Sequence, residues 1–174
     1  MAISTLWAIF LAQIGALPPV VGEMTLNQTL RDHKFTAGLS DTQVATLAKL
    51  ATEVHFAEDE VILLDGQRST SFYFVVSGSV VVELSTPRYA VCVQSLEPGR
   101  VFGWSALLDA QDTLFQVRAR EATTALQIDG AALKACRFAD PALGTELLHR
   151  ALSVVAGRVK ATELRFAEMC GVRV

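Results

Sequence analysis

The sequence predicts a mainly β domain with flanking α-helices, in which short antiparallel strands form a jelly roll or small barrel. From about residue 53 onward, runs rich in Val, Phe and Tyr alternate with evenly spaced glycine or polar turns, a pattern typical of such folds. A long stretch with a helical repeat follows at residues 141–169, and an apolar stretch, expected to be helical, opens the chain. We therefore divide the chain into residues 1–31, an apolar N-terminal segment and linker, and residues 32–174, one domain that includes the C-terminal helix.

Composition excludes several classes of function. The 174 residues carry a formal net charge of -3, and the 15 Lys and Arg are scattered rather than clustered, so the chain lacks the basic patch that nucleic-acid binding requires. The three cysteines lie far apart, and no paired carboxylates, metal-ligand cluster or nucleophile motif is apparent. We therefore expect a protein that is not an enzyme, with no catalytic residue, no metal and no cofactor.

The N-terminal segment carries no charged side chain from Ala2 to Leu17. As a helix it would be about 24 Å long, slightly shorter than the bilayer core of about 30 Å. Four interpretations stay open: a single membrane anchor, a cleaved signal, a segment that packs on protein, or residues before a true start at Met24. The side chains expected to contact a membrane or a partner are Trp7, Phe10, Leu11 and Ile14.

The distribution of basic residues bears on location. Arg31 and Lys34 follow the apolar stretch, and no basic side chain precedes it. Since basic residues tend to stay on the cytoplasmic side of a membrane span, we expect the domain in the cytoplasm, either free or anchored on the cytoplasmic face of a membrane.

The first helix of the domain is predicted over residues 39–50, capped by Ser40 or Asp41, because apolar residues recur there at three-residue steps. Beyond it, Gly66 and Gly78 fall where tight turns need a positive φ. The predicted strands cover residues 53–57, 61–65, 72–76, 80–84, 89–95, 114–119 and 122–129, which we interpret as a meander of neighbouring antiparallel strands.

The C-terminal helix carries an apolar seam whose members recur in steps of three and four, as in a heptad repeat. The seam residues are Leu148, Leu152, Val155, Val159, Thr162, Phe166 and Met169. This seam is expected either to pack on the β domain or to pair with a second copy of the chain.

The region from about Phe35 to Arg165 resembles the cyclic nucleotide-binding domain superfamily, which includes the catabolite activator protein and the regulatory subunit of protein kinase A. Three motifs carry the resemblance in the family's order and spacing: Asp65-Gly66-Gln67, the run FYFVVSGSV at residues 72–80, and LEPGRVFG at residues 96–103. The resemblance implies an antiparallel β-roll followed by a long C-terminal helix.

Members of this superfamily hold their ligand with a phosphate-binding cassette, a short helix between strands. The resemblance implies that the Trp104 position belongs to a ribose-binding Glu, the Thr113 position to a phosphate-binding Arg, and the next two positions to small residues. Threonine offers a neutral hydroxyl in place of a cation, and an indole can only donate a hydrogen bond. The cassette positions expected to line any ligand pocket are Phe102, Gly103, Trp104, Ser105, Ala106, Leu107, Thr113, Leu114 and Phe115.

These departures lead to two expectations about function. The first is a non-enzymatic regulatory or accessory subunit that docks to a partner protein, with membrane association or a homodimer through the C-terminal helix as further contacts, and that does not bind cAMP in the usual way. The alternative is a small-molecule sensor that binds a cyclic nucleotide or another ligand in the β-roll pocket. No DNA partner is expected, because the sequence ends at Val174 without the helix-turn-helix that follows the long helix in transcription factors of this superfamily.

Overall fold

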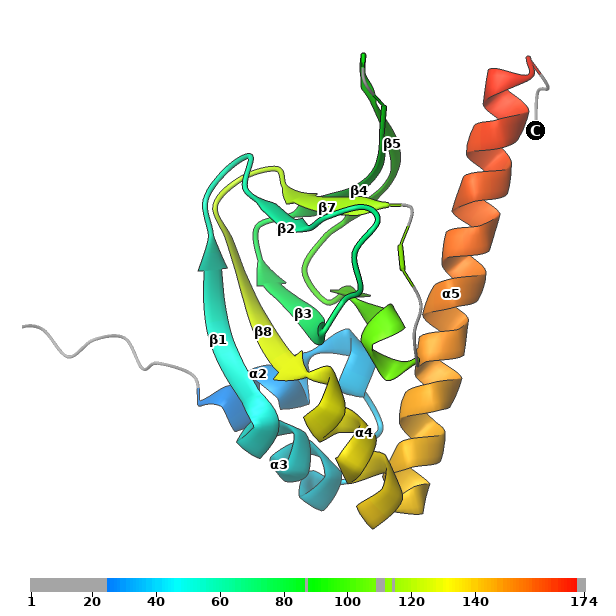
Figure 1. The fold of residues 1–174 in the computed structure, drawn as a ribbon. Helices are drawn as coiled ribbons and strands as arrows, with labels where there is room; N and C mark the ends of the chain where they lie inside the picture. Colours follow the sequence, from blue (N-terminus) through cyan, green and yellow to red (C-terminus); the bar gives the residue numbers. More distant parts are fainter. Residues whose placement is uncertain (1–24, 87, 109–111, 114, 172–174) are drawn as a thin grey trace, which may run out of the picture.

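A computed structural model of the chain describes residues 25–86, 88–108, 112–113 and 115–171. In chain order the elements are α2 (Leu26–Asp32), η1 (Lys34–Thr36), α3 (Asp41–Leu50), β1 (Ala51–Phe56), β2 (Val61–Leu63), β3 (Ser71–Ser77), β4 (Val80–Ser85), β5 (Ala90–Leu96), β6 (Val101–Phe102), η2 (Trp104–Leu107), β7 (Gln116–Ala119), β8 (Thr123–Asp129), α4 (Gly130–Ala139) and α5 (Pro141–Met169). The helices α2, α3 and α4 gather at one end of a β-roll, and α5 runs along its side (Figure 1). The predicted mainly β fold with flanking helices is confirmed.

The β-roll consists of two antiparallel four-stranded sheets. Their strand orders are β1-β8-β3-β6 and β2-β7-β4-β5. Within the described residues, β4 and β5 are the one pair of consecutive strands that lie side by side, while β1 pairs with β8. The interpretation as a meander of neighbouring strands is therefore wrong, and the jelly-roll type of pairing, which joins distant strands, is what forms.

Most of the element boundaries predicted from local signals lie within two residues of the observed ones. Ser40 caps α3 in a capping box with Gln43: its hydroxyl accepts from the Gln43 backbone N–H, and the Gln43 side chain accepts from the Ser40 N–H. Gly66 and Gly78 have positive φ angles of 69° and 74°, as the turns predicted. The short helix α4 was not predicted, although Asp129 caps it by accepting from the Ala132 N–H at 2.9 Å.

The strand β3 separates two hydrophobic cores. Its alternate side chains point to opposite faces, so Phe72 and Phe74 face the helices, while Tyr73 and Val75 face the second sheet. All four side chains are buried. Burial on both faces explains why β3 reads as a continuous apolar run rather than as an alternating one.

The long helix α5 begins and ends where its periodicity predicted. The carboxylate of Asp140 caps it by accepting from the N–H groups of Ala142 and Leu143 at 3.1 and 3.0 Å. Its first turns pack into the helix-side core through Leu143, Leu147 and Ala151, all buried.

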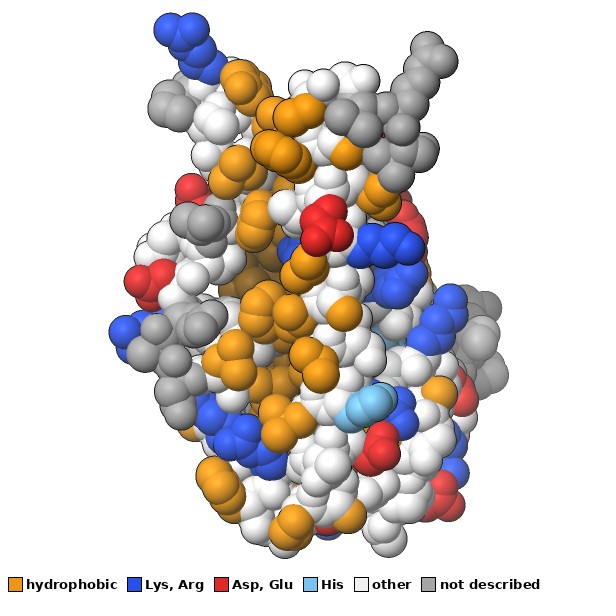
Figure 2. Space-filling view, turned by 90° about the vertical axis from the view of Figure 1, so that its right-hand side faces the viewer, with side chains coloured by type: hydrophobic (Ala, Val, Ile, Leu, Met, Phe, Trp, Pro, Cys, Tyr) orange, Lys and Arg blue, Asp and Glu red, His pale blue; other side chains and the backbone are white. Residues whose placement is uncertain are grey.

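Most of the predicted α5 seam does not pack on the β-roll. Leu152, Val159, Phe166 and Met169 are each more than half exposed, and Leu148 is 40% exposed. Figure 2 shows hydrophobic side chains gathered in a band along the face of the molecule that carries α5. The face of α5 that contacts the rest of the domain consists of residues that each precede a seam residue by one position. These residues are Ala151, Val154, Arg158 and Ala161.

The four apolar N-terminal side chains singled out above, Trp7, Phe10, Leu11 and Ile14, lie outside the described residues. Among the helices that the structure describes, none has both the length and the hydrophobicity needed to span a bilayer.

Candidate functional site

The cassette segment folds as a tight turn followed by a single 3-10 turn. After β6, Gly103 adopts a left-handed conformation with φ 76° and begins η2. A Cβ atom at this position would lie 2.3 Å from the backbone oxygen of Ser71, which is far inside contact distance. The glycine is therefore required both by its backbone conformation and by the close approach of β3.

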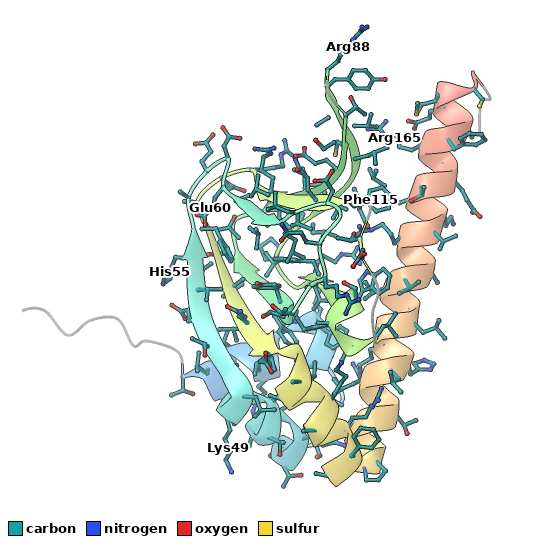
Figure 3. All side chains as sticks on the ribbon, in the orientation of Figure 1. Lys49, His55, Glu60, Arg88, Phe115 and Arg165 are labelled. Carbon is teal, nitrogen blue, oxygen red and sulfur yellow. The ribbon has the colours of Figure 1, made fainter. Side chains whose placement is uncertain are left out.

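A cavity of about 240 Å³ lies between the second sheet, η2 and α5. Its described lining is mostly apolar: Leu63, Val82, Phe102, Gly103, Trp104, Ser105, Asp112, Thr113, Phe115, Val117 and Arg158. Figure 3 shows Phe115 on the side of the β-roll that faces α5. The volume is below the roughly 300–1,000 Å³ of common ligand pockets, and Trp104 and Phe115 contribute large rings to its wall.

The structure brings most of the predicted cassette residues together. Phe102, Gly103, Trp104, Ser105, Thr113 and Phe115 all line the cavity. Ala106 and Leu107 are buried away from it, Leu107 in the helix-side core. Leu114 lies outside the described residues.

The hydroxyl of Thr113 is already engaged by its own loop. Thr113 Oγ1 accepts from the Phe115 backbone N–H and donates to the Phe115 carbonyl oxygen, both at 3.1 Å. The Thr113 carbonyl oxygen accepts from the Gly66 N–H at 2.7 Å, and the Thr113 N–H donates to the Gln67 carbonyl oxygen at 3.3 Å. These bonds hold the loop in place, so the hydroxyl has little capacity left for a ligand.

The fold and this segment have a counterpart among known protein families. Residues 53–140 match the model of the cyclic nucleotide-binding domain. The chain belongs to the cyclic nucleotide-binding domain family. The match begins in β1, includes the whole cassette and ends just before α5.

Several solved structures share this fold. A putative cyclic nucleotide-binding protein from Geobacter metallireducens is 26% identical, with a TM-score of 0.69 over 78% of this chain and 99% of that one. A cyclic nucleotide-binding domain from Methylobacillus flagellatus is 18% identical, with a TM-score of 0.70 over 83% and 82%. The regulatory subunit of a cAMP-independent protein kinase A from Trypanosoma brucei is 17% identical, with a TM-score of 0.64 over 83% of this chain and 50% of that one.

A sequence relative is an enzyme of much greater length. Glutaminase 2 of Bradyrhizobium diazoefficiens is 32% identical over 80 residues, which make up 46% of this chain and 12% of that protein. The chain therefore resembles a short segment of that enzyme.

Arginines near the cassette in sequence do not line the cavity of this cyclic nucleotide-binding domain. Arg118 Nε donates to Glu83 Oε1 at 2.8 Å, so its charge is neutralised by a buried carboxylate. Arg120 is exposed and donates to Ser95 Oγ at 3.4 Å. Arg100 lies in the turn just before β6 and is also exposed. None of the three belongs to the cavity lining.

One arginine that was not predicted does line the cavity. Arg158 reaches it from α5, 43 positions after Phe115 in the sequence, and its Nε donates to Gln94 Oε1 on β5 at 2.9 Å. Burial lowers the pKa of Arg158 to about 10, so the side chain stays protonated at neutral pH. A signal for it existed in the sequence: the residues of the helix one turn away from Arg158 on this face, Val154 and Ala161, are uncharged, so Arg158 is a basic residue in an apolar neighbourhood.

Proposed function

We propose that this chain is a non-enzymatic regulatory or accessory module that docks to a partner protein and does not bind cAMP in the usual way. The observation that carries the proposal is the state of the cassette: Thr113 stands at the position of the phosphate-binding arginine, and its hydroxyl is engaged by the backbone of Phe115.

The contacts that the resemblance implies to be missing support weak binding of cAMP. A hydrogen bond to a charged group contributes about 1.5–3 kcal/mol, and the resemblance implies two such contacts, one from an Arg at 113 and one from a Glu at 104. Losing both lowers the affinity for cAMP by roughly 10²–10⁴-fold. The partly filled cavity of about 240 Å³ adds a steric cost to this loss.

The exposed seam of α5 is the surface that we propose for docking. Leu152, Phe166 and Met169 are 66%, 69% and 70% exposed, and large apolar side chains aligned along one helix face are typical of protein interfaces. Pairing with the same seam of a second copy would bury these side chains, so we propose a homodimer through α5 as the simplest arrangement. Residues 1–21 are proposed as a second contact, with a membrane or a partner, which would place the module on the cytoplasmic face of a membrane.

The relatives are consistent with an accessory role. The Geobacter protein is named as a putative cyclic nucleotide-binding protein, and the glutaminase match spans 12% of an enzyme. The glutaminase match supports a module of this kind joined to another activity. A second candidate, a small-molecule sensor, is favoured by one observation, a cavity in the β-roll into which the half-buried Arg158 reaches.

Calorimetric titration with cAMP and cGMP tests the proposal. The wild type is compared with the Thr113→Arg, Trp104→Glu double variant and with a triple variant that adds Phe115→Ala to enlarge the cavity. We expect no binding heat from the wild type and measurable binding by the triple variant. Micromolar binding of cAMP by the wild type would contradict the proposal.

A further inference from the structure

Three arginines connect α5 to the rest of the domain, and one of them differs from the others. Arg150, Arg158 and Arg165 lie about two helical turns apart, so they share a face of the helix. Arg150 and Arg165 donate to backbone carbonyl oxygens of the domain at 2.6 and 2.9 Å, whereas Arg158 donates to the side-chain oxygen of Gln94 at 2.9 Å. Figure 3 shows Arg165 between α5 and the β4–β5 hairpin.

The difference concerns charge. Arg150 Nε lies 3.2 Å from Glu146 Oε2, and Arg165 Nη1 lies 2.6 Å from Glu168 Oε2, so each of these two cations has a carboxylate on its own helix. The residues one turn away from Arg158 are uncharged: Val154, Val155, Ala161 and Thr162. Among the residues that the structure describes, no carboxylate forms an ion pair with Arg158, and Gln94 is the one hydrogen-bond partner of its guanidinium.

The cavity is where this unneutralised charge lies. Withdrawing a cation from water is costly unless an anion or several hydrogen bonds compensate. The other charged residue of the described lining, Asp112, is mostly exposed, and its Oδ1 lies 3.4 Å from Arg68 Nε. A ligand anion that entered the cavity would therefore meet a guanidinium that has no competing carboxylate beside it.

We propose that the cavity binds a small aromatic monocarboxylic acid, with its carboxylate held by Arg158 and its ring packed between Trp104 and Phe115. The Nε of Arg158 is engaged by Gln94, which leaves the two terminal nitrogens of the guanidinium for a carboxylate. Two parallel N–H···O bonds are the geometry in which Arg and a carboxylate pair best.

Size and charge both favour a monocarboxylate. A cavity of about 240 Å³ with an apolar lining suits a small flat ligand. A phosphate monoester would bring a second negative charge toward a site with one lining cation and with Asp112 at its edge, so a single charge is the better match. This inference goes beyond the proposed docking role and does not depend on it.

The test uses the full chain and named probes. Indole-3-acetate and benzoate are titrated by calorimetry, alongside their uncharged amides indole-3-acetamide and benzamide, and alongside inorganic phosphate. We expect at least one of the acids to bind, with its amide weaker by roughly 10- to 100-fold, since the amide cannot form the charged pair. Arg158→Gln should weaken binding of the acid by the same factor, and Arg158→Lys should restore part of it.

Controls separate the site from the stability of the fold. Arg150→Gln removes an arginine of the same helix that lies outside the cavity lining, and it should leave the affinity unchanged within about twofold. An NMR spectrum of the wild type provides a readout without substitution: the Arg158 Nε–H signal, assigned by its loss in Arg158→Lys, should move on addition of the acid.

Several outcomes overturn the inference: no binding of either acid, equal binding of acid and amide, tighter binding of inorganic phosphate, or an Arg158→Gln variant that binds like the wild type. Binding of cAMP through the cassette would instead contradict the proposed function, so the two failures are distinguishable.

Discussion

The close approach of β3 to the cassette glycine makes a quantitative prediction about Gly103→Ala. Placing an L-residue in the left-handed region costs about 1–2 kcal/mol. The added Cβ would lie 2.3 Å from the Ser71 carbonyl oxygen, a backbone atom of a central strand, and displacing that strand should add the cost of overpacking, about 1–3 kcal/mol. Gly66→Ala is the matched control, because Gly66 has nearly the same φ, 69°, and a Cβ added there would have nothing within 4 Å.

Urea unfolding followed by circular dichroism measures the two free energies. We expect Gly66→Ala to lower the free energy of unfolding by about 1–2 kcal/mol and Gly103→Ala by about 2–5 kcal/mol. With an m-value of about 2 kcal/mol/M, the unfolding midpoints should then differ by about 0.5–1.5 M urea. Equal midpoints would refute the argument that the approach of Ser71, beyond the positive φ, requires glycine in the cassette.

Three further predictions concern stability and assembly. Burial lowers the pKa of His33 below its ordinary value of 6.5, so the folded state takes up a proton less readily than the unfolded state. The contribution of His33 to stability should therefore be fully present above pH 6.5 and fall as the pH drops through the folded pKa, by at most about 1.4 kcal/mol per pH unit. Urea unfolding at several pH values should show that the free energy of unfolding of His33→Gln depends less on pH than that of the wild type. An equal pH dependence would contradict this role of His33. Leu126→Ala, at a side chain with no exposed surface, should cost about 2–5 kcal/mol, whereas Leu152→Ala on the exposed seam should cost about 0.5 kcal/mol or less in the monomer. Light scattering should give the mass of a dimer for the wild type and of a monomer for the Leu152→Glu, Phe166→Glu double variant. A monomeric wild type would contradict pairing through α5.

Features set by neighbours in sequence were predictable. The capping box at Ser40 and the start of α5 at Pro141 rest on residues within one helical turn of each other. The left-handed glycine at 78 follows from local turn geometry in the same way. Such local signals placed most of the strands, together with α3 and α5, without any knowledge of their partners, whereas α2, β6 and α4 were not predicted.

Features set by distant residues were not predictable from pattern alone. The pairing of β1 with β8 joins the first and the last strand of the β-roll, and no local rule indicates it. The exposure of the α5 seam depends on which helix face the β-roll covers, and the heptad pattern left both faces open. Arg158 acquires its place in the cavity through Gln94, 64 residues away, so its environment exists only in the folded chain.

The direct test of the degenerate cassette is an NMR titration of the isotopically labelled wild type with cAMP, followed at the backbone amides of Gly103 and Thr113. The loop hydrogen bonds of Thr113 predict that these signals stay in place up to millimolar cAMP. A saturable shift of both amides at micromolar cAMP would mean that the cassette binds the nucleotide without its arginine, and the account of this site would be wrong.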